Sequence, residues 1–212
     1  MIPALAETVA IAKYLLMVEA TKVRAHFGLL SCGASVELIR IAKDKGLPIT
    51  ADVAMHQLHL TESLIDGFNS LAHVRPPLRA ESDKELLRQG LKSGVIDAIC
   101  THHEPLSSSA KLAPFAETLP GFTAFDTYVS FGVQLVNEGL FTPLEWVEKV
   151  TVAPARVSNM TARWLEQAGL VLVDPELEWT VSRETILSQG KNTPLLNQQV
   201  KGKAIRVFAP LA

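Results

Sequence analysis

The sequence has little cysteine and no long hydrophobic run. Its two cysteines, Cys32 and Cys100, are too few for a disulfide framework, and neither belongs to a C-x-x-C pair. This usage is typical of a reducing, cytoplasmic setting. No apolar stretch reaches the roughly 18–20 residues of a membrane-spanning helix, and residues 1–7 lack the basic segment that opens a secretory signal peptide. We therefore expect a soluble cytoplasmic protein.

The charge of the sequence is nearly balanced, which excludes a further set of functions. Lys and Arg number 20 against 22 Asp and Glu, so the formal net charge is −2. Binding to nucleic acids or anionic membranes usually requires a clear excess of basic side chains, and we expect neither partner. With 212 residues, 48% of them hydrophobic, the chain can bury a substantial core in one domain and still carry a small appendage.

The first half of the chain alternates between helical and extended patterns. Short connections separate the segments, such as Gly46 and Pro48, which end a helix in the expected positions. The repeated order of helix and strand with short links predicts parallel βα units. The predicted helices are 3–20, 35–45 and 82–92, the last capped by Ser82 or Asp83, and the predicted strands are 23–30, 49–60 and 95–100.

The stretch around which the chain is organised is Val95–Leu106, with the sequence V-I-D-A-I-C-T-H-H-E-P-L. Its short apolar run follows Gly94 and predicts a buried strand, because a helix would need a longer run. Two histidines and a glutamate follow directly. Proteins of the α/β class carry their chemistry at the carboxyl ends of parallel strands. Any active site of this chain is therefore expected here.

The pattern changes after residue 106. Ser107–Ser109 predicts a loop, and helices are then predicted at 125–138, 143–150 and 154–159. Short strands are predicted at 169–173, where Asp174-Pro175 ends the first of them, and at 179–181 and 204–208. We therefore divide the chain into a βα part, residues 1–160, and a C-terminal β module segment, residues 161–212.

A series of short motifs follows a fixed order along the chain. The motifs are Ala25-His26, Gly46–Pro48, Thr50–Val53, Pro76–Arg79, Ile96–Ile99, Ala153–Arg156, Leu170–Pro175, Lys191–Pro194 and Val200–Gly202. In this order they resemble the dihydroorotases, which belong to the amidohydrolase superfamily of metal-dependent (β/α)8 barrels. The resemblance covers essentially the whole chain. It implies an α/β fold: the C-terminal part of a TIM barrel, with about its last three strands, plus a small β module.

The residues at the family's site positions depart from the family pattern. The last barrel strand of the family ends in T-D-H-A-P-H, whose aspartate binds metal and activates the bridging hydroxide. Here His102 occupies the aspartate position, and Leu106 replaces the final histidine, which contacts substrate. Arg75 stands where active members have an asparagine before the double proline. His26 matches the histidine ligand of the sixth strand, so His26 and His102 are candidate vestigial metal ligands.

The resemblance also bears on the cofactor. Active relatives use zinc, and the family's H-x-H pair, carboxylated lysine and fifth-strand histidine correspond to positions before residue 1. Metal-assisted hydrolysis needs a Lewis acid and a base within reach of the bound hydroxide. His26 and His102 cannot assemble a binuclear centre alone, and His102 brings neither the negative charge nor the base of an aspartate. We therefore expect no resident cofactor.

The pattern of replacements at positions 75, 102 and 106 resembles that of the inactive dihydroorotase-like proteins of some proteobacteria. It implies a non-catalytic subunit that assembles with aspartate carbamoyltransferase, as an oligomer, in de novo pyrimidine biosynthesis. Two alternatives remain open. One is an active zinc-dependent cyclic-amide hydrolase, of the dihydroorotase or hydantoinase type, with His102 as an alternative catalytic ligand. The other is a truncated fragment without independent function, whose open sheet edges would favour association.

The neighbouring polar residues have simpler explanations. Adjacent residues of a strand point to opposite faces, so His103 should be structural if His102 faces the pocket. By the same rule His56 and His59, three positions apart on the predicted strand 49–60, should lie on opposite faces. Cys100 is expected in the core, and Glu104 is the one acid that could act as a weak base.

Overall fold

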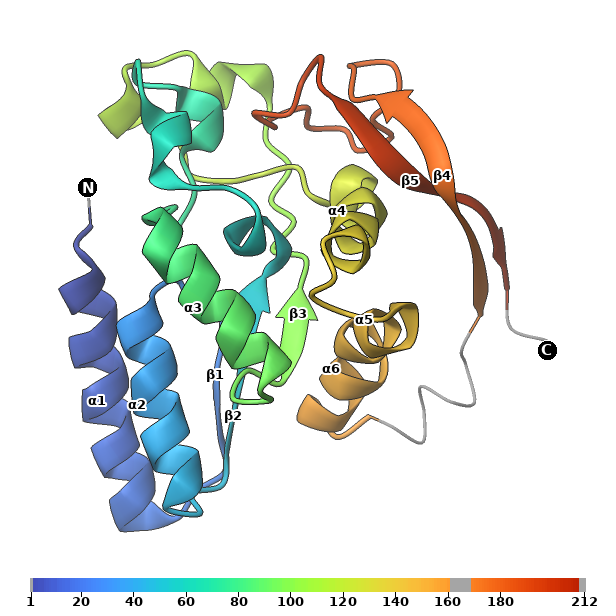
Figure 1. Cartoon of the computed structure of the whole chain (residues 1–212). Helices are drawn as coiled ribbons and strands as arrows, with labels where there is room; N and C mark the ends of the chain where they lie inside the picture. Colours follow the sequence, from blue (N-terminus) through green and yellow to red (C-terminus); the bar gives the residue numbers. More distant parts are fainter. Residues whose placement is uncertain (1, 161–168, 210–212) are drawn as a thin grey trace.

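The computed structural model describes residues 2–160 and 169–209 (Figure 1). In this part of the chain, three parallel strands packed against helices precede a two-stranded antiparallel ribbon. The first elements are α1 (Ala4–Thr21), β1 (Ala25–Phe27), α2 (Gly33–Asp44), β2 (Ile49–Ala54), α3 (Glu81–Lys92) and β3 (Ala98–Cys100). They are followed by α4 (Phe125–Asn137), α5 (Pro143–Val150), α6 (Val152–Val157), β4 (Leu170–Thr180) and β5 (Gln199–Phe208).

The parallel sheet separates an apolar face from a polar one. Its order is β1-β2-β3. In β2 the residues Ile49, Ala51 and Val53 are buried, whereas Thr50 and Asp52 between them are only partly buried. Because successive side chains of a strand alternate between faces, the two polar residues share the face opposite the core. The sheet thus presents these polar residues on the face opposite the core that it shares with the first three helices.

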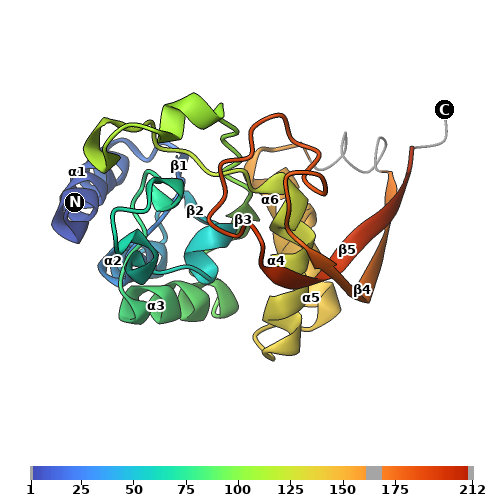
Figure 2. The ribbon, with the colours of Figure 1, turned by 90° about the horizontal axis from the view of Figure 1, so that it is seen from above.

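The helices α1, α2 and α3 follow one another around one side of the sheet (Figure 2). Their inward faces form the main core with the buried face of β2, through residues such as Val36, Ile39, Leu87 and Leu91. The helix α1 is apolar on nearly all sides, so part of its surface carries exposed side chains such as Leu5 and Leu16. None of the described helices combines the length and apolar character needed to cross a membrane.

The predicted strand 49–60 is too long. The strand β2 ends at Ala54, and Met55–Leu58 forms a turn of 3-10 helix in which all four side chains are buried. A run that is buried on every side has no alternation, so the sequence pattern could not separate a strand from a tight helical turn. The expectation that His56 and His59 lie on opposite faces of a regular strand is therefore wrong.

Several other element boundaries differ from the prediction. The strand β1 is shorter than 23–30, and the helix α3 has no side-chain cap from Ser82 or Asp83. The Asp83 carboxylate instead accepts a hydrogen bond, 2.9 Å long, from the amide of Gly33 at the start of α2. The two short strands predicted at 169–173 and 179–181 form one strand, β4, whose pairing with β5 shifts register between Asp174 and Glu178.

The ribbon β4–β5 packs on helix α4 (Figure 1). The Ser130 hydroxyl of α4 donates to the Gly202 carbonyl of β5 at 2.5 Å, and the Trp179 indole of β4 donates to the Ser130 hydroxyl at 3.2 Å. All three residues are buried. These contacts join the ribbon to the helical layer through a common core.

The contact between α4 and α5 requires a glycine at position 132. A Cβ atom there would lie 2.1 Å from the ring of the buried Trp146. We expect Gly132→Ala to lower the free energy of unfolding by about 1–3 kcal/mol, because overpacking outweighs the better helix propensity of alanine. Chemical denaturation measures this change. In a Trp146→Leu background the same substitution should cost much less, and an equal cost in both backgrounds would contradict the steric explanation.

Candidate functional site

The polar face of the sheet holds one histidine in a defined network. His26 of β1 lies beside Thr50 and Asp52 of β2, because β1 and β2 pair in parallel with His26 opposite Thr50. Its ring Nδ1 is 2.9 Å from the Thr50 hydroxyl, and its Nε2 is 2.9 Å from the Asp52 carboxylate. Both ring nitrogens of His26 are therefore engaged by neighbouring side chains.

The Asp52 carboxylate is the electrostatic centre of this network. Besides His26 it accepts the amide of Leu29 at 2.7 Å. Burial alone would raise the pKa of Asp52, but the hydrogen bonds from His26 and Leu29 outweigh it and hold this pKa below its usual value. Burial, with the nearby Asp52 charge, raises the pKa of the Cys100 thiol, so this cysteine stays a neutral thiol at physiological pH.

His102 lies in a different environment, just beyond β3. Its backbone adopts a left-handed conformation with φ of 46°, and only 9% of its side chain is exposed. Its ring stacks on His56 with 5.5 Å between centroids, and His56 in turn contacts Phe122. The Nε2 of His102 is 3.5 Å from the Glu104 carboxylate, while its Nδ1 is buried with no partner among the described residues.

The structure agrees with the structural role expected for His103. Its Nδ1 accepts the backbone amides of Ala124 and Phe125, both at 3.1 Å, at the start of helix α4. Its ring also stacks on Phe125, with 4.0 Å between centroids. His103 therefore accepts hydrogen bonds from the backbone amides at the amino terminus of α4.

The remaining predicted site positions are not joined to these histidines. Arg75 is exposed, and its side chain has no hydrogen bond or ion pair within the described residues. The backbone amide of Leu106 donates a hydrogen bond to the Asn192 side chain at 2.7 Å. No interaction between side chains in the described ranges links either residue to His26 or His102.

These residues do not fit a zinc site by themselves. A catalytic zinc ion needs at least three protein ligands. Across residues 2–160 and 169–209, no three histidine, cysteine or acidic side chains gather as a metal site would require. Both nitrogens of His26 are hydrogen-bonded, and His102 is stacked on the buried His56. The described residues alone therefore do not supply the ligand set of a catalytic zinc ion.

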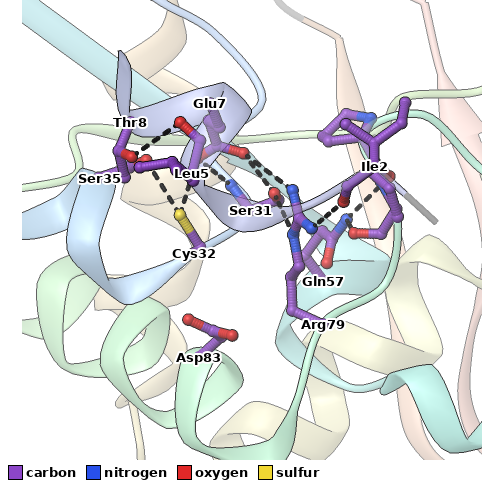
Figure 3. A network of polar contacts seen from close by, with 12 residues as sticks. Ile2, Leu5, Glu7, Thr8, Ser31, Cys32, Ser35, Gln57, Arg79 and Asp83 are labelled. Carbon is purple, nitrogen blue, oxygen red and sulfur yellow. Dashed lines mark hydrogen bonds and ion pairs between the residues drawn. The ribbon is translucent and has the colours of Figure 1, made fainter. Parts of the chain in front are cut away.

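A buried polar network that no sequence motif predicted joins α1, the loop after β1 and the segment before α3 (Figure 3). The Arg79 guanidinium donates to the Ser31 hydroxyl at 3.0 Å and to the Ile2 carbonyl at 2.6 Å, and it lies 3.9 Å from the Glu7 carboxylate. Glu7 also accepts the amide and the hydroxyl of Ser31. Pairings so distant in sequence leave no local pattern from which the network could be predicted.

Comparison with solved structures shows the fold class of the chain. No family model matches the chain. Among solved structures, D-hydantoinase from Thermus aligns with a TM-score of 0.89 at 21% identity, over 98% of this chain and 48% of that one. The inactive dihydroorotase-like domain of the Chaetomium thermophilum CAD-like multifunctional protein aligns with a TM-score of 0.70, also at 21% identity, over 94% and 53%. The chain thus has the fold of the C-terminal part of a (β/α)8 barrel.

Sequence comparison then gives the family. The chain is 41% identical over 205 residues to a dihydroorotase-like protein of Pseudomonas aeruginosa, covering 95% of this chain and 48% of the relative. It is 36% identical over 207 residues to a dihydroorotase of Syntrophus aciditrophicus, covering 96% and 49%. The chain therefore belongs to the family of dihydroorotases and dihydroorotase-like proteins. It spans about half the length of these relatives and corresponds to their C-terminal half.

Proposed function

We propose that the chain is part of a non-catalytic dihydroorotase-like subunit that supports aspartate carbamoyltransferase in de novo pyrimidine biosynthesis. The observation that carries this proposal is the state of the two vestigial ligands. His26 has both ring nitrogens hydrogen-bonded, to Thr50 and Asp52. His102, at the family's aspartate position, is largely buried, stacks on His56, and brings no negative charge to the site.

Two further features support the same proposal. At position 106 a leucine replaces a histidine, so this side chain offers a substrate no hydrogen bond. The relative from Pseudomonas aeruginosa and another from Pseudomonas putida, 42% identical over 204 residues, are both named dihydroorotase-like protein rather than dihydroorotase. A scaffold role requires an intact surface and fold but no catalytic base.

The test combines an activity assay with an assembly assay. The chain is mixed with aspartate carbamoyltransferase from the same source and passed over a size-exclusion column, and dihydroorotate hydrolysis is measured with and without added zinc. We expect co-elution, and hydrolysis no faster than in buffer. The full-length Pseudomonas aeruginosa relative, assayed in parallel, serves as the comparison for the half-length chain.

Two outcomes would contradict the proposal. Zinc-dependent hydrolysis that disappears in a His26→Ala variant would favour the cyclic-amide hydrolase instead. Absence of co-elution by a folded chain and by the full-length relative alike would remove the scaffold role. As a matched variant, His102→Asp restores the family's carboxylate, yet we expect it to remain inactive because positions 75 and 106 still differ.

A further inference from the structure

A cavity of about 370 Å³ lies between loops that are distant in sequence. It is lined by residues from the segment before α3, from the segment after β3, and from the connection between β4 and β5. Figure 1 shows these segments gathered at the end of the molecule toward which β2 and β3 point. Ligand cavities typically begin at about 300 Å³, so a small molecule fits this volume.

The charged side chains that line the cavity are all basic. They are Lys111, Arg183 and Lys191, and no aspartate or glutamate is among the lining residues. Glu104 lies near enough to Lys111, and Glu184 near enough to Arg183 and Lys191, to attract these cations, but neither glutamate lines the cavity. Glu184 accepts the Ser182 hydroxyl at 2.6 Å, and Glu104 lies 3.5 Å from His102. The cavity therefore has an excess of positive charge, although the chain as a whole is slightly acidic.

The two lysines are held in place by neutral groups. The Lys111 ammonium, in a residue only 6% exposed, donates to the carbonyls of His73 at 3.0 Å and Leu119 at 2.8 Å. The Lys191 ammonium donates to the Ile186 carbonyl. Backbone carbonyls orient an ammonium group without neutralising it. Burial lowers the pKa of Lys111 to about 8, and a bound anion would favour its charged form.

The third cation and the rest of the wall are suited to a ligand. The Arg183 guanidinium has no hydrogen-bond or ion-pair partner in the described part of the chain, so its planar set of donors is available. Ser108 lines the cavity as well. Four leucines, Leu106 among them, supply apolar surface. Such a wall fits a molecule with one charged end and one apolar body.

We propose that this cavity binds a small anion, a phosphate or carboxylate group carried on an apolar body, through Lys111, Arg183 and Lys191. Guanidinium and ammonium groups form charge-assisted hydrogen bonds with either anion. The site includes neither His26 nor His102 and does not depend on the proposed non-catalytic role. At position 106, leucine gives this cavity an apolar wall.

The experiment uses three simple probes at constant ionic strength. Phenyl phosphate and benzoate carry the two anions on the same apolar ring, and benzyl alcohol is the uncharged control. Thermal unfolding of the whole chain reports binding, because a ligand of the folded state raises the Tm. We expect an anionic probe, but not benzyl alcohol, to raise the Tm. The tighter of the two anionic probes identifies phosphate or carboxylate as the preferred group.

A pair of arginine variants separates a specific site from general attraction. Arg183→Ala removes the available guanidinium from an exposed position. It should lower the affinity for the preferred anion about tenfold. Arg206→Ala removes the same charge from β5, where Arg206 lies over the Phe208 ring outside the cavity, and should change the affinity less than twofold. Absence of any anion-dependent shift, or equal losses in the two variants, would overturn the proposal.

Discussion

Replacement of Arg79 by methionine is expected to lower the free energy of unfolding by about 3–5 kcal/mol, the typical cost of breaking a buried ion pair. Only 7% of the Arg79 side chain is exposed and only 16% of the Glu7 side chain. Methionine fills much of the same space but leaves the Glu7 carboxylate without its cation. It also leaves the Ile2 carbonyl without the guanidinium that donates to it at 2.6 Å.

Urea denaturation measures this loss as a lower midpoint. The matched control is Arg40→Met on α2, where the guanidinium pairs with Glu37 and Asp44 but its side chain is 47% exposed. Exposed pairs of this kind contribute about 0–1 kcal/mol, so the control should cost little. Similar midpoints for the two variants would contradict the importance of the buried network.

The network of Glu7, Ser31 and Arg79 joins several elements, so its loss should destabilise more than one helix. Glu7 belongs to α1, Ser31 follows β1, and Arg79 precedes α3 (Figure 3). One cluster therefore fixes the first helix, a loop at the carboxyl end of the sheet, and the segment that contains Arg75. A double variant, Glu7→Gln with Arg79→Met, should cost less than the sum of the single variants, since neither charge is then left alone.

The sequence predicts the βα layer well because its signals are local. Ile49–Val53 alternates between apolar and polar residues, and this alternation alone assigns Thr50 and Asp52 to the polar face. The helix α5 has the predicted bounds, Pro143–Val150, and Thr142 and Glu145 form the local capping box that begins it. In each case the residues that decide the structure are within a few positions of one another.

Where the sequence-based predictions fail, contacts between distant parts of the chain decide the structure. Met55–Leu58 is shaped by burial on all sides, and Asp83 caps α2 rather than its own helix, so tertiary contacts override the local pattern. The resemblance to the dihydroorotases identified His26 and His102 as candidate vestigial metal ligands. It did not reveal that Asp52 and Thr50 engage the first and that His56 stacks on the second. The basic cavity was missed because its cations come from positions 111, 183 and 191.

Acid should destabilise the chain through His56, which is buried, and through His59, which is partly buried but whose ring nitrogens are shielded from solvent. Burial, together with the charge of His102, lowers the pKa of His56 to about 3 from an ordinary value of 6.5. Burial, followed by the charges of Arg88 and Lys84, lowers the pKa of His59 to about 3 as well. None of the four ring nitrogens of these two residues has a hydrogen-bond partner within the described residues. Protonation would therefore place an uncompensated charge in the core.

The direction of the pH effect follows from proton uptake. Between about pH 6.5 and pH 3 the unfolded chain binds a proton at each histidine and the folded chain does not. The free energy of unfolding therefore falls as pH falls through this window, and the contribution is fully present only above pH 6.5. At pH 5 the expected loss is about 2 kcal/mol per histidine, or about 4 kcal/mol for the pair.

Urea midpoints measured at pH 7 and pH 5 test this expectation. The double variant His56→Leu with His59→Leu removes both titrating groups, and it should lose most of the difference between the two pH values. Each single variant should lose about half of it. Leucine leaves no ring nitrogen unpaired, so the cost at pH 7 should be modest. If the double variant kept the full acid sensitivity of the parent chain, the protons would be taken up elsewhere, and these two histidines would not be its cause.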